Sequence, residues 1–90
     1  MIQELTYQER LNRFEIAQET IGFLMAIRTR YIAQEEKKNK PDASLIEGWR
    51  IEFRGFFDEL HSLDLKDDAK IQHVLDEYCP IVKAAYEQAT

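Results

Sequence analysis

The chain has 90 residues, of which 44% are hydrophobic and 32% charged, with only three glycines and two prolines. This length suits one domain, residues 1–90, and the composition argues against both a disordered chain and a loop-rich β fold. The net charge of −5, from 17 acidic and 12 basic residues, makes a polyanion such as DNA an unfavourable partner.

The cysteine content and the N-terminal composition bear on the compartment. Cys79 is the single cysteine, so no disulfide can form within the chain. Residues 1–5 lack the basic and then apolar regions of a signal peptide. The longest apolar run, residues 21–27, is far shorter than the roughly 20 residues that cross a bilayer. We therefore expect a cytoplasmic protein that makes no membrane contact.

The first predicted helix covers residues 7–37. Thr6 is a suitable N-cap and Glu9 completes a capping box, while Asn39 and Pro41 end the helix. On a helical wheel the apolar residues cover an arc of about 200°, twice the roughly 100° that one core face needs. This helix therefore needs neighbours on more than one side, supplied either by two helices of the same chain or by a partner chain.

The second predicted helix covers residues 44–62, with Asp42 or Ser44 as its cap. Spacings of three and four define an apolar stripe, widened by Phe57, that consists of Leu45, Trp49, Phe53, Phe56, Leu60 and Leu63. The reverse face carries Gly48, Ile51 and Gly55. Because glycine inside a helix costs about 0.8–1.0 kcal/mol relative to alanine, the glycines either lie exposed at that cost or admit another helix at close range.

A homodimer accounts for both the wide apolar arc of the first helix and the glycine face of the second. We expect its interface to contain Phe23, Ile27, Gly48, Ile51 and Gly55. Closed twofold dimers are the commonest oligomers, and a second copy would enlarge a core that is small for a chain of this length.

The third predicted helix covers residues 67–89, with Asp64 or Asp67 as its cap. Pro80 lies inside it and removes the hydrogen bond to the carbonyl of Asp76, which predicts either a kinked helix or two shorter helices that meet there. The resulting fold class is all-α: a three-helix antiparallel bundle with a long first helix and a third helix kinked at Pro80, which dimerises into a larger bundle.

Arg54 and His61 lie two helical turns apart, on one face of the second helix. An arginine separated from a histidine by four to six residues resembles the catalytic motif of the helical HEPN ribonucleases. The resemblance implies RNA cleavage by this pair at a dimer interface. Gly55 departs from the polar residue usual in that family, whose bundle is also longer. The alternative is a solvated strip in which Arg50 pairs with Glu47, and Arg54 with Asp58.

Three other polar features have simpler interpretations. Arg28 lies on the core side of the first helix, so we expect a snorkelling stem or an ion pair with Glu52, Glu59 or a partner's carboxylate; the alternative is an anchor for an acidic ligand. His73 and Glu77 supply two metal ligands where a stable site needs three or four. Cys79 is expected to be a small core residue rather than a nucleophile.

The sequence contains no constellation typical of catalysis and no phosphate-binding glycine loop, so we expect neither catalytic residues nor a cofactor nor a metal. The function predicted by elimination is protein binding: a homodimeric adaptor, inhibitor, or antitoxin-like or immunity-like protein that presents an acidic helical surface to a larger protein partner. The alternatives are the ribonuclease and a small nucleic-acid-associated regulator.

Overall fold

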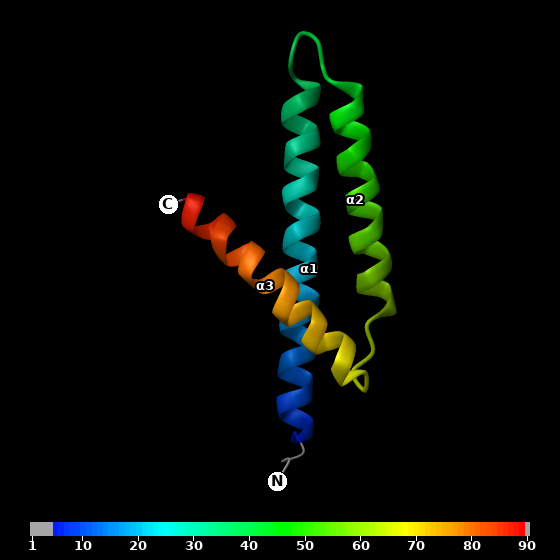
Figure 1. Cartoon of the computed structure of the whole chain (residues 1–90), viewed down its shortest axis with the longest axis vertical. Helices are drawn as coiled ribbons and strands as arrows, with labels where there is room; N and C mark the ends of the chain where they lie inside the picture. The colour runs from blue at the N-terminus through cyan, green and yellow to red at the C-terminus, as the bar shows by residue number, and fades with distance from the viewer. Residues whose placement is uncertain (1–4, 90) are drawn as a thin grey trace.

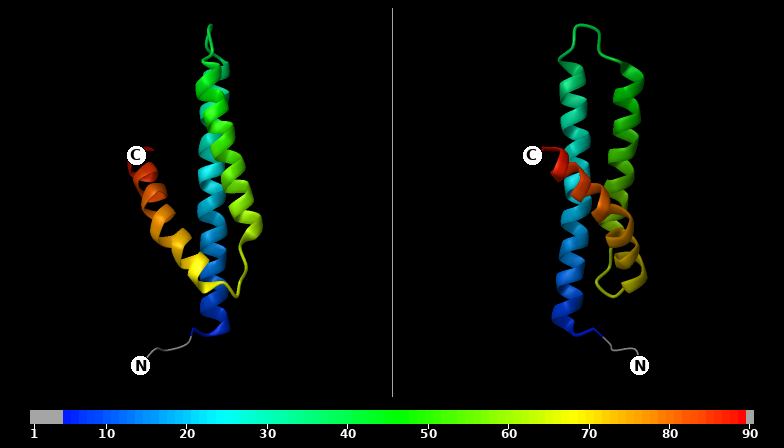
Figure 2. Two further views of the ribbon diagram at one scale, coloured as in Figure 1. Left: turned by 45° about the vertical axis from the view of Figure 1, so that its right-hand side comes forward. Right: turned by 60° about the vertical axis from the view of Figure 1, so that its left-hand side comes forward.

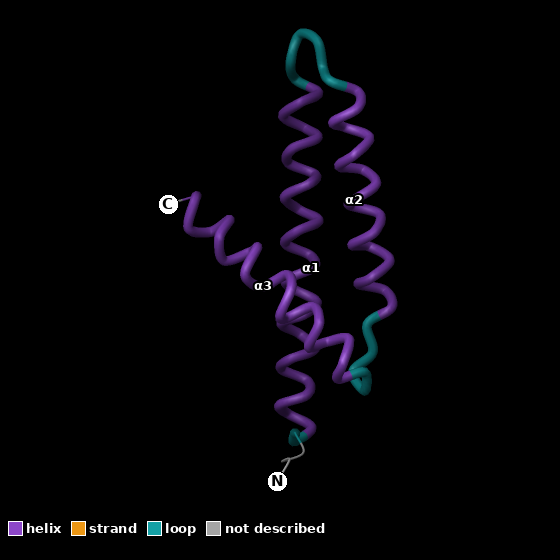
Figure 3. Tube along the Cα trace, viewed as in Figure 1, coloured by secondary structure: helices purple, strands orange, loops and turns teal. Residues whose placement is uncertain are grey.

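A computed structural model describes residues 5–89 and contains three α-helices, with no strand in that range (Figure 3). They are α1 (Tyr7–Glu36), α2 (Ala43–Ser62) and α3 (Asp68–Ala89). The expected ranges were 7–37, 44–62 and 67–89. Residues 1–4, which carried most of the argument against a signal peptide, lie outside the described residues. No helix in the described part of the chain is both long and apolar enough to span a bilayer.

Polar side chains cap each helix at its N-terminus. The Thr6 hydroxyl accepts a hydrogen bond from the Glu9 amide at 3.1 Å. Asp42 accepts from the amides of Ser44 and Leu45 at 3.0 and 3.2 Å. Asp67, the second of the two expected caps of α3, accepts from the Lys70 amide at 3.1 Å. Each bond satisfies an amide that has no partner within its own helix, and each fixes where the helix begins.

The helices form an antiparallel hairpin and a third element that crosses it. In Figures 1 and 2, α1 and α2 run side by side, while α3 crosses α1 obliquely and carries the C-terminus away from α2. Among the described residues, no Cα of α2 lies within 8 Å of a Cα of α3. Long side chains join these two helices instead: Tyr78 packs edge-on against Phe56 and donates a hydrogen bond to Glu59 at 2.6 Å.

The core lies where α3 crosses α1. Ala17 and Ile21 of α1 and Ile71 and Val74 of α3 are at most 1% exposed and form one cluster. Leu24 continues this buried side of α1. The apolar run at residues 21–27 is therefore buried on one side only.

Pro80 lies within a helix that continues without interruption to Ala89. The expectation of two shorter helices meeting at this position is therefore wrong. Pro80 and Asp76 are both exposed. Water can reach this part of the helix, where the Asp76 carbonyl has lost its amide partner, and this lowers the cost of placing proline in a helix interior.

The molecule is elongated, with extents of 59 × 29 × 17 Å. Its radius of gyration is 15.9 Å, whereas a compact chain of this length has a value of about 12 Å. The larger radius of gyration follows from the arrangement of the helices, because α1 and α2 extend well beyond the region that α3 covers (Figure 1).

Candidate functional site

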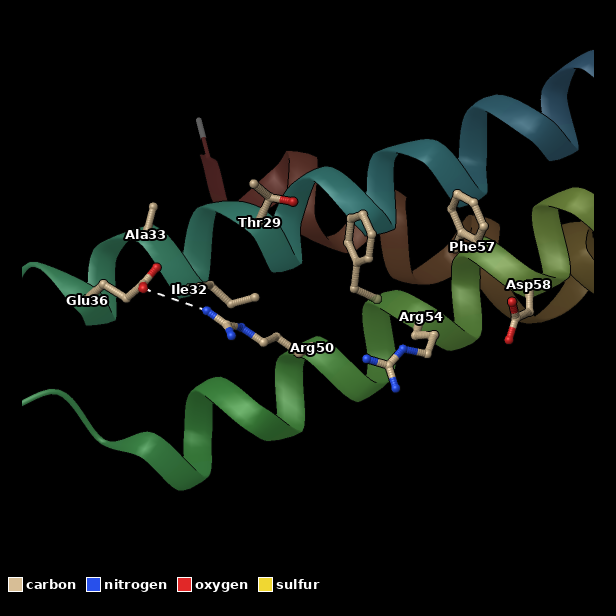
Figure 4. A pocket seen from close by; sticks show the side chains of 9 residues that line it. Thr29, Ile32, Ala33, Glu36, Arg50, Arg54, Phe57 and Asp58 are labelled. Atoms are coloured by element: carbon tan, nitrogen blue, oxygen red, sulfur yellow. Dashed lines mark ion pairs between the residues drawn. The ribbon is translucent and has the colours of Figure 1, made fainter.

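A groove runs between α1 and α2 and encloses about 670 Å³ (Figure 4). We call it the α1–α2 groove; its lining consists of Thr29, Ile32, Ala33, Glu36, Arg50, Phe53, Arg54, Phe57 and Asp58. Apolar side chains make up its floor, and charged side chains stand along its edges. The groove exists because two helices alone leave the space between their apolar stripes open on this side.

Phe57, which widens the apolar stripe of α2, is not buried against the rest of the chain. The side chain lines the α1–α2 groove and remains 43% exposed. The reason is that α3 approaches the hairpin through Phe56 and Glu59, and so leaves the groove uncovered. No residue of α2 is fully buried, although the helix contains eight large apolar residues.

The charges along the groove pair differently from the solvated strip that was expected. Arg50 forms its ion pair with Glu36 of α1, at 3.7 Å, rather than with Glu47 of its own helix (Figure 4). Arg54 and Asp58, one turn apart, form no ion pair within the described part of the chain. The nearby helix α1 gives Arg50 a carboxylate that a wheel of α2 alone could not show.

Glu35 ties the end of α1 to the start of α2. Its carboxylate binds Lys38 at 2.9 Å and accepts a hydrogen bond from the Asp42 amide at 3.0 Å. The side chain is only 6% exposed. The hydrogen bond from Lys38, followed by that from Asp42, lowers the pKa of Glu35 below its ordinary value of 4.5, because both interactions favour the ionised carboxylate.

Arg28 has the ion-pair partner that was expected from the same chain. Its guanidinium binds Glu52 of α2. It also lies 5.8 Å from the ring centre of Tyr31 and 5.7 Å from that of Phe56, within the range of cation–π attraction. This arrangement accounts for a charged residue on the inner side of α1 without an external acidic ligand.

The five residues expected at a self-interface lie on two helices, Phe23 and Ile27 on α1 and the other three on α2. Phe23 stacks on Tyr86 of α3 at 4.7 Å between ring centres, and Ile27 is half-buried. Gly48 and Gly55 lie on α2, where an added Cβ would meet nothing within 4 Å. Within residues 5–89, no other helix comes within 4 Å of a Cβ added at these glycines, so a close contact there would need a second molecule.

Arg54 lines the α1–α2 groove, whereas His61 is not among the groove-lining residues. The Nδ1 atom of His61 lies 3.0 Å from the Phe57 carbonyl, and its ring packs on Phe57 at 4.1 Å between centres. His61 contributes to a separate shallow hollow beside Gln18. The ribonuclease role of Arg54 and His61 stays a prediction.

Of the remaining polar candidates, Cys79 has a partner inside the fold, whereas His73 and Glu77 lie at the surface. Cys79 is half-buried, with its sulfur 3.5 Å from the Thr20 hydroxyl. His73 and Glu77 are exposed, and over the described residues no three histidine, cysteine or acidic side chains are grouped to hold a metal. Burial, followed by the hydrogen bond to Glu59, raises the pKa of Tyr78 to about 12.

Five of the nine groove residues, namely Arg50, Phe53, Arg54, Phe57 and Asp58, stand out in the sequence but were assigned other roles. Phe53 and Phe57 were placed in one core stripe, and Arg54 in a charged strip. The sequence feature that could have indicated the groove is the apolar arc of α1, which is wider than one neighbouring helix can cover. Comparison with protein families, with curated proteins and with solved structures finds no match to this chain.

Proposed function

We propose that this chain is a protein-binding module that first pairs with a second copy of itself and then presents its remaining acidic surface to a larger protein, as an adaptor or inhibitor does. The observation that supports this most directly is the incomplete burial of α2. Every one of its 20 residues retains solvent exposure, although its apolar stripe is that of a core helix.

The total exposed area supports the same proposal. The folded chain exposes 6783 Å², whereas about 5,500 Å² is typical of a monomer of this mass. The difference, about 1,300 Å², exceeds the roughly 800 Å² that each partner buries in a standard interface. A second copy of the chain could therefore cover the excess. Assembly into a larger antiparallel bundle and a kink at Pro80 belong to this proposal.

Charge supports the second part of the proposal. The net charge is −5, and the exposed carboxylates include Glu15, Glu19, Asp76 and Glu77. Such a surface attracts a basic partner over distances comparable to the Debye length. With an identified partner, the association rate should therefore fall steeply as salt is added.

Light scattering of the purified chain across a dilution series tests the proposal. The expected mass at high concentration is twice the chain mass of 10.7 kDa, falling toward the single-chain value on dilution. A single-chain mass at every concentration would contradict self-association, and the exposed apolar side chains would then be available to another protein.

A further inference from the structure

We propose that two copies of this chain pair through the α1–α2 groove, groove against groove, so that two hairpins form a four-helix core. This inference rests on the self-association proposed above and specifies its surface. The groove has an apolar floor that includes Ile32, Phe53 and Phe57, and one hairpin leaves that floor open to water. A second hairpin presents the same kind of surface, so each floor can cover the other.

The groove is free within one chain. All of its lining residues belong to α1 or α2, and in Figure 4 the ribbon of α3 passes behind the hairpin. The side of the hairpin that α3 crosses therefore already has a third helix over part of its length. The groove side has none, and the excess exposed area is large enough for an interface of standard size.

Charge favours a second copy as the occupant. The edges of the groove carry Arg50, Arg54, Glu36 and Asp58, two positive and two negative charges, whereas the whole chain carries −5. Two copies of an acidic protein repel each other over most orientations. A contact between two grooves brings together surfaces of zero net charge and so keeps the repulsion between the two copies small at the contact.

Arg54 and Asp58 can complete their electrostatic interactions in such a pair. Neither forms an ion pair within the described part of the chain. If α2 lies antiparallel to α2 of the second copy, with the twofold axis level with position 56 and thus one residue from Phe57, Arg54 of each copy stands opposite Asp58 of the other. Symmetry then gives two equivalent ion pairs on either side of the two phenyl rings.

The glycine face of α2 is a less favourable surface for a symmetric contact. Ile51 is 59% exposed there and is the one large apolar residue between Gly48 and Gly55. On a helical wheel, Glu47 and Asp58 lie within about 40° of it. A twofold contact through this face would bring carboxylates of the two copies together.

The test compares two substitutions that place the same carboxylate on different faces of α2. Phe57→Asp lies in the groove and Ile51→Asp on the glycine face, and circular dichroism checks that both variants fold. Light scattering should show Phe57→Asp raising the dimer dissociation constant by at least roughly thirtyfold. Ile51→Asp should raise it much less, because its carboxylate leaves the apolar floor intact and can only compete for Arg54, three residues away. A dimer weakened only by Ile51→Asp would rule out the groove as the interface and leave the proposed self-association standing.

A charge exchange tests the groove without disturbing its apolar floor. Arg54→Glu should weaken the dimer by roughly tenfold, and the double variant Arg54→Glu with Asp58→Arg should restore it. Arg30→Glu, on an exposed face of α1, makes the same change in net charge and should have little effect. Equal effects of the Arg54 and Arg30 variants, or a double variant as weak as Arg54→Glu, would overturn the inference. A wild-type chain that never dimerises would overturn the proposed self-association as well.

Discussion

The two halves of α1 differ in how many helices cover them. Ala17, Ile21 and Leu24 lie between α2 and the crossing helix α3, and each is at most 1% exposed. Ile32, farther along, lines the groove between the two hairpin helices and stays half-buried, and Tyr31 is 41% exposed. Both halves carry apolar residues at helical spacing. The comparison shows that a third helix, rather than a richer apolar sequence, turns partial burial into a core.

The largest expected effect is the loss of stability when an isoleucine in each half of α1 is truncated to alanine. Ile21→Ala removes a fully buried side chain at the crossing and should lower the free energy of unfolding by about 2–5 kcal/mol. Ile32→Ala should cost less than half as much when the chain is monomeric, because part of its side chain already contacts water. Urea denaturation at low protein concentration measures both losses. Equal losses would contradict the division of the molecule into a covered and an uncovered half.

The sequence was sufficient to locate the helices but not to arrange them. Thr6, Asp42 and Asp67 act as local caps, so their roles depend on residues only two or three positions away. The position of α3 depends instead on a crossing over α1, which no periodicity encodes. The exposure of Phe57 follows from that crossing, so the apolar stripe of α2 alone could not reveal it. Glu35 was also missed, because its contact with Asp42 depends on the path of the connection between two helices.

A smaller effect is expected in the pH dependence of stability, which should differ between the α1–α3 crossing and the far end of the hairpin. At the crossing, Tyr78 has an ordinary pKa of 10.0 and a folded pKa of about 12. The unfolded chain therefore loses its phenolic proton first, and the free energy of unfolding should fall as pH rises from about 10 toward 12. Tyr78→Phe should remove that dependence in denaturation curves measured across this range.

At the end of the hairpin the dependence has the opposite direction. The pKa of Glu35 is lowered from 4.5 by its contacts with Lys38 and Asp42. The stabilisation is therefore present above pH 4.5 and is lost as pH falls below it, when the carboxylate becomes protonated. Glu35→Gln should weaken the loss of stability at acid pH and leave the loss of stability at alkaline pH unchanged. If Glu35→Gln also removed the fall in stability at alkaline pH, the two ends of the molecule would not respond to pH independently.

Hydrogen exchange at two protein concentrations tests the central claim most directly, because it compares the two halves within one molecule. At low concentration, amides of residues 17–24 and 71–74 should be protected, while those of residues 27–36 and 46–57 should exchange faster. At high concentration, protection should rise in the second set and change little in the first. Protection that is uniform along the hairpin and independent of concentration would contradict an uncovered half that a second copy completes.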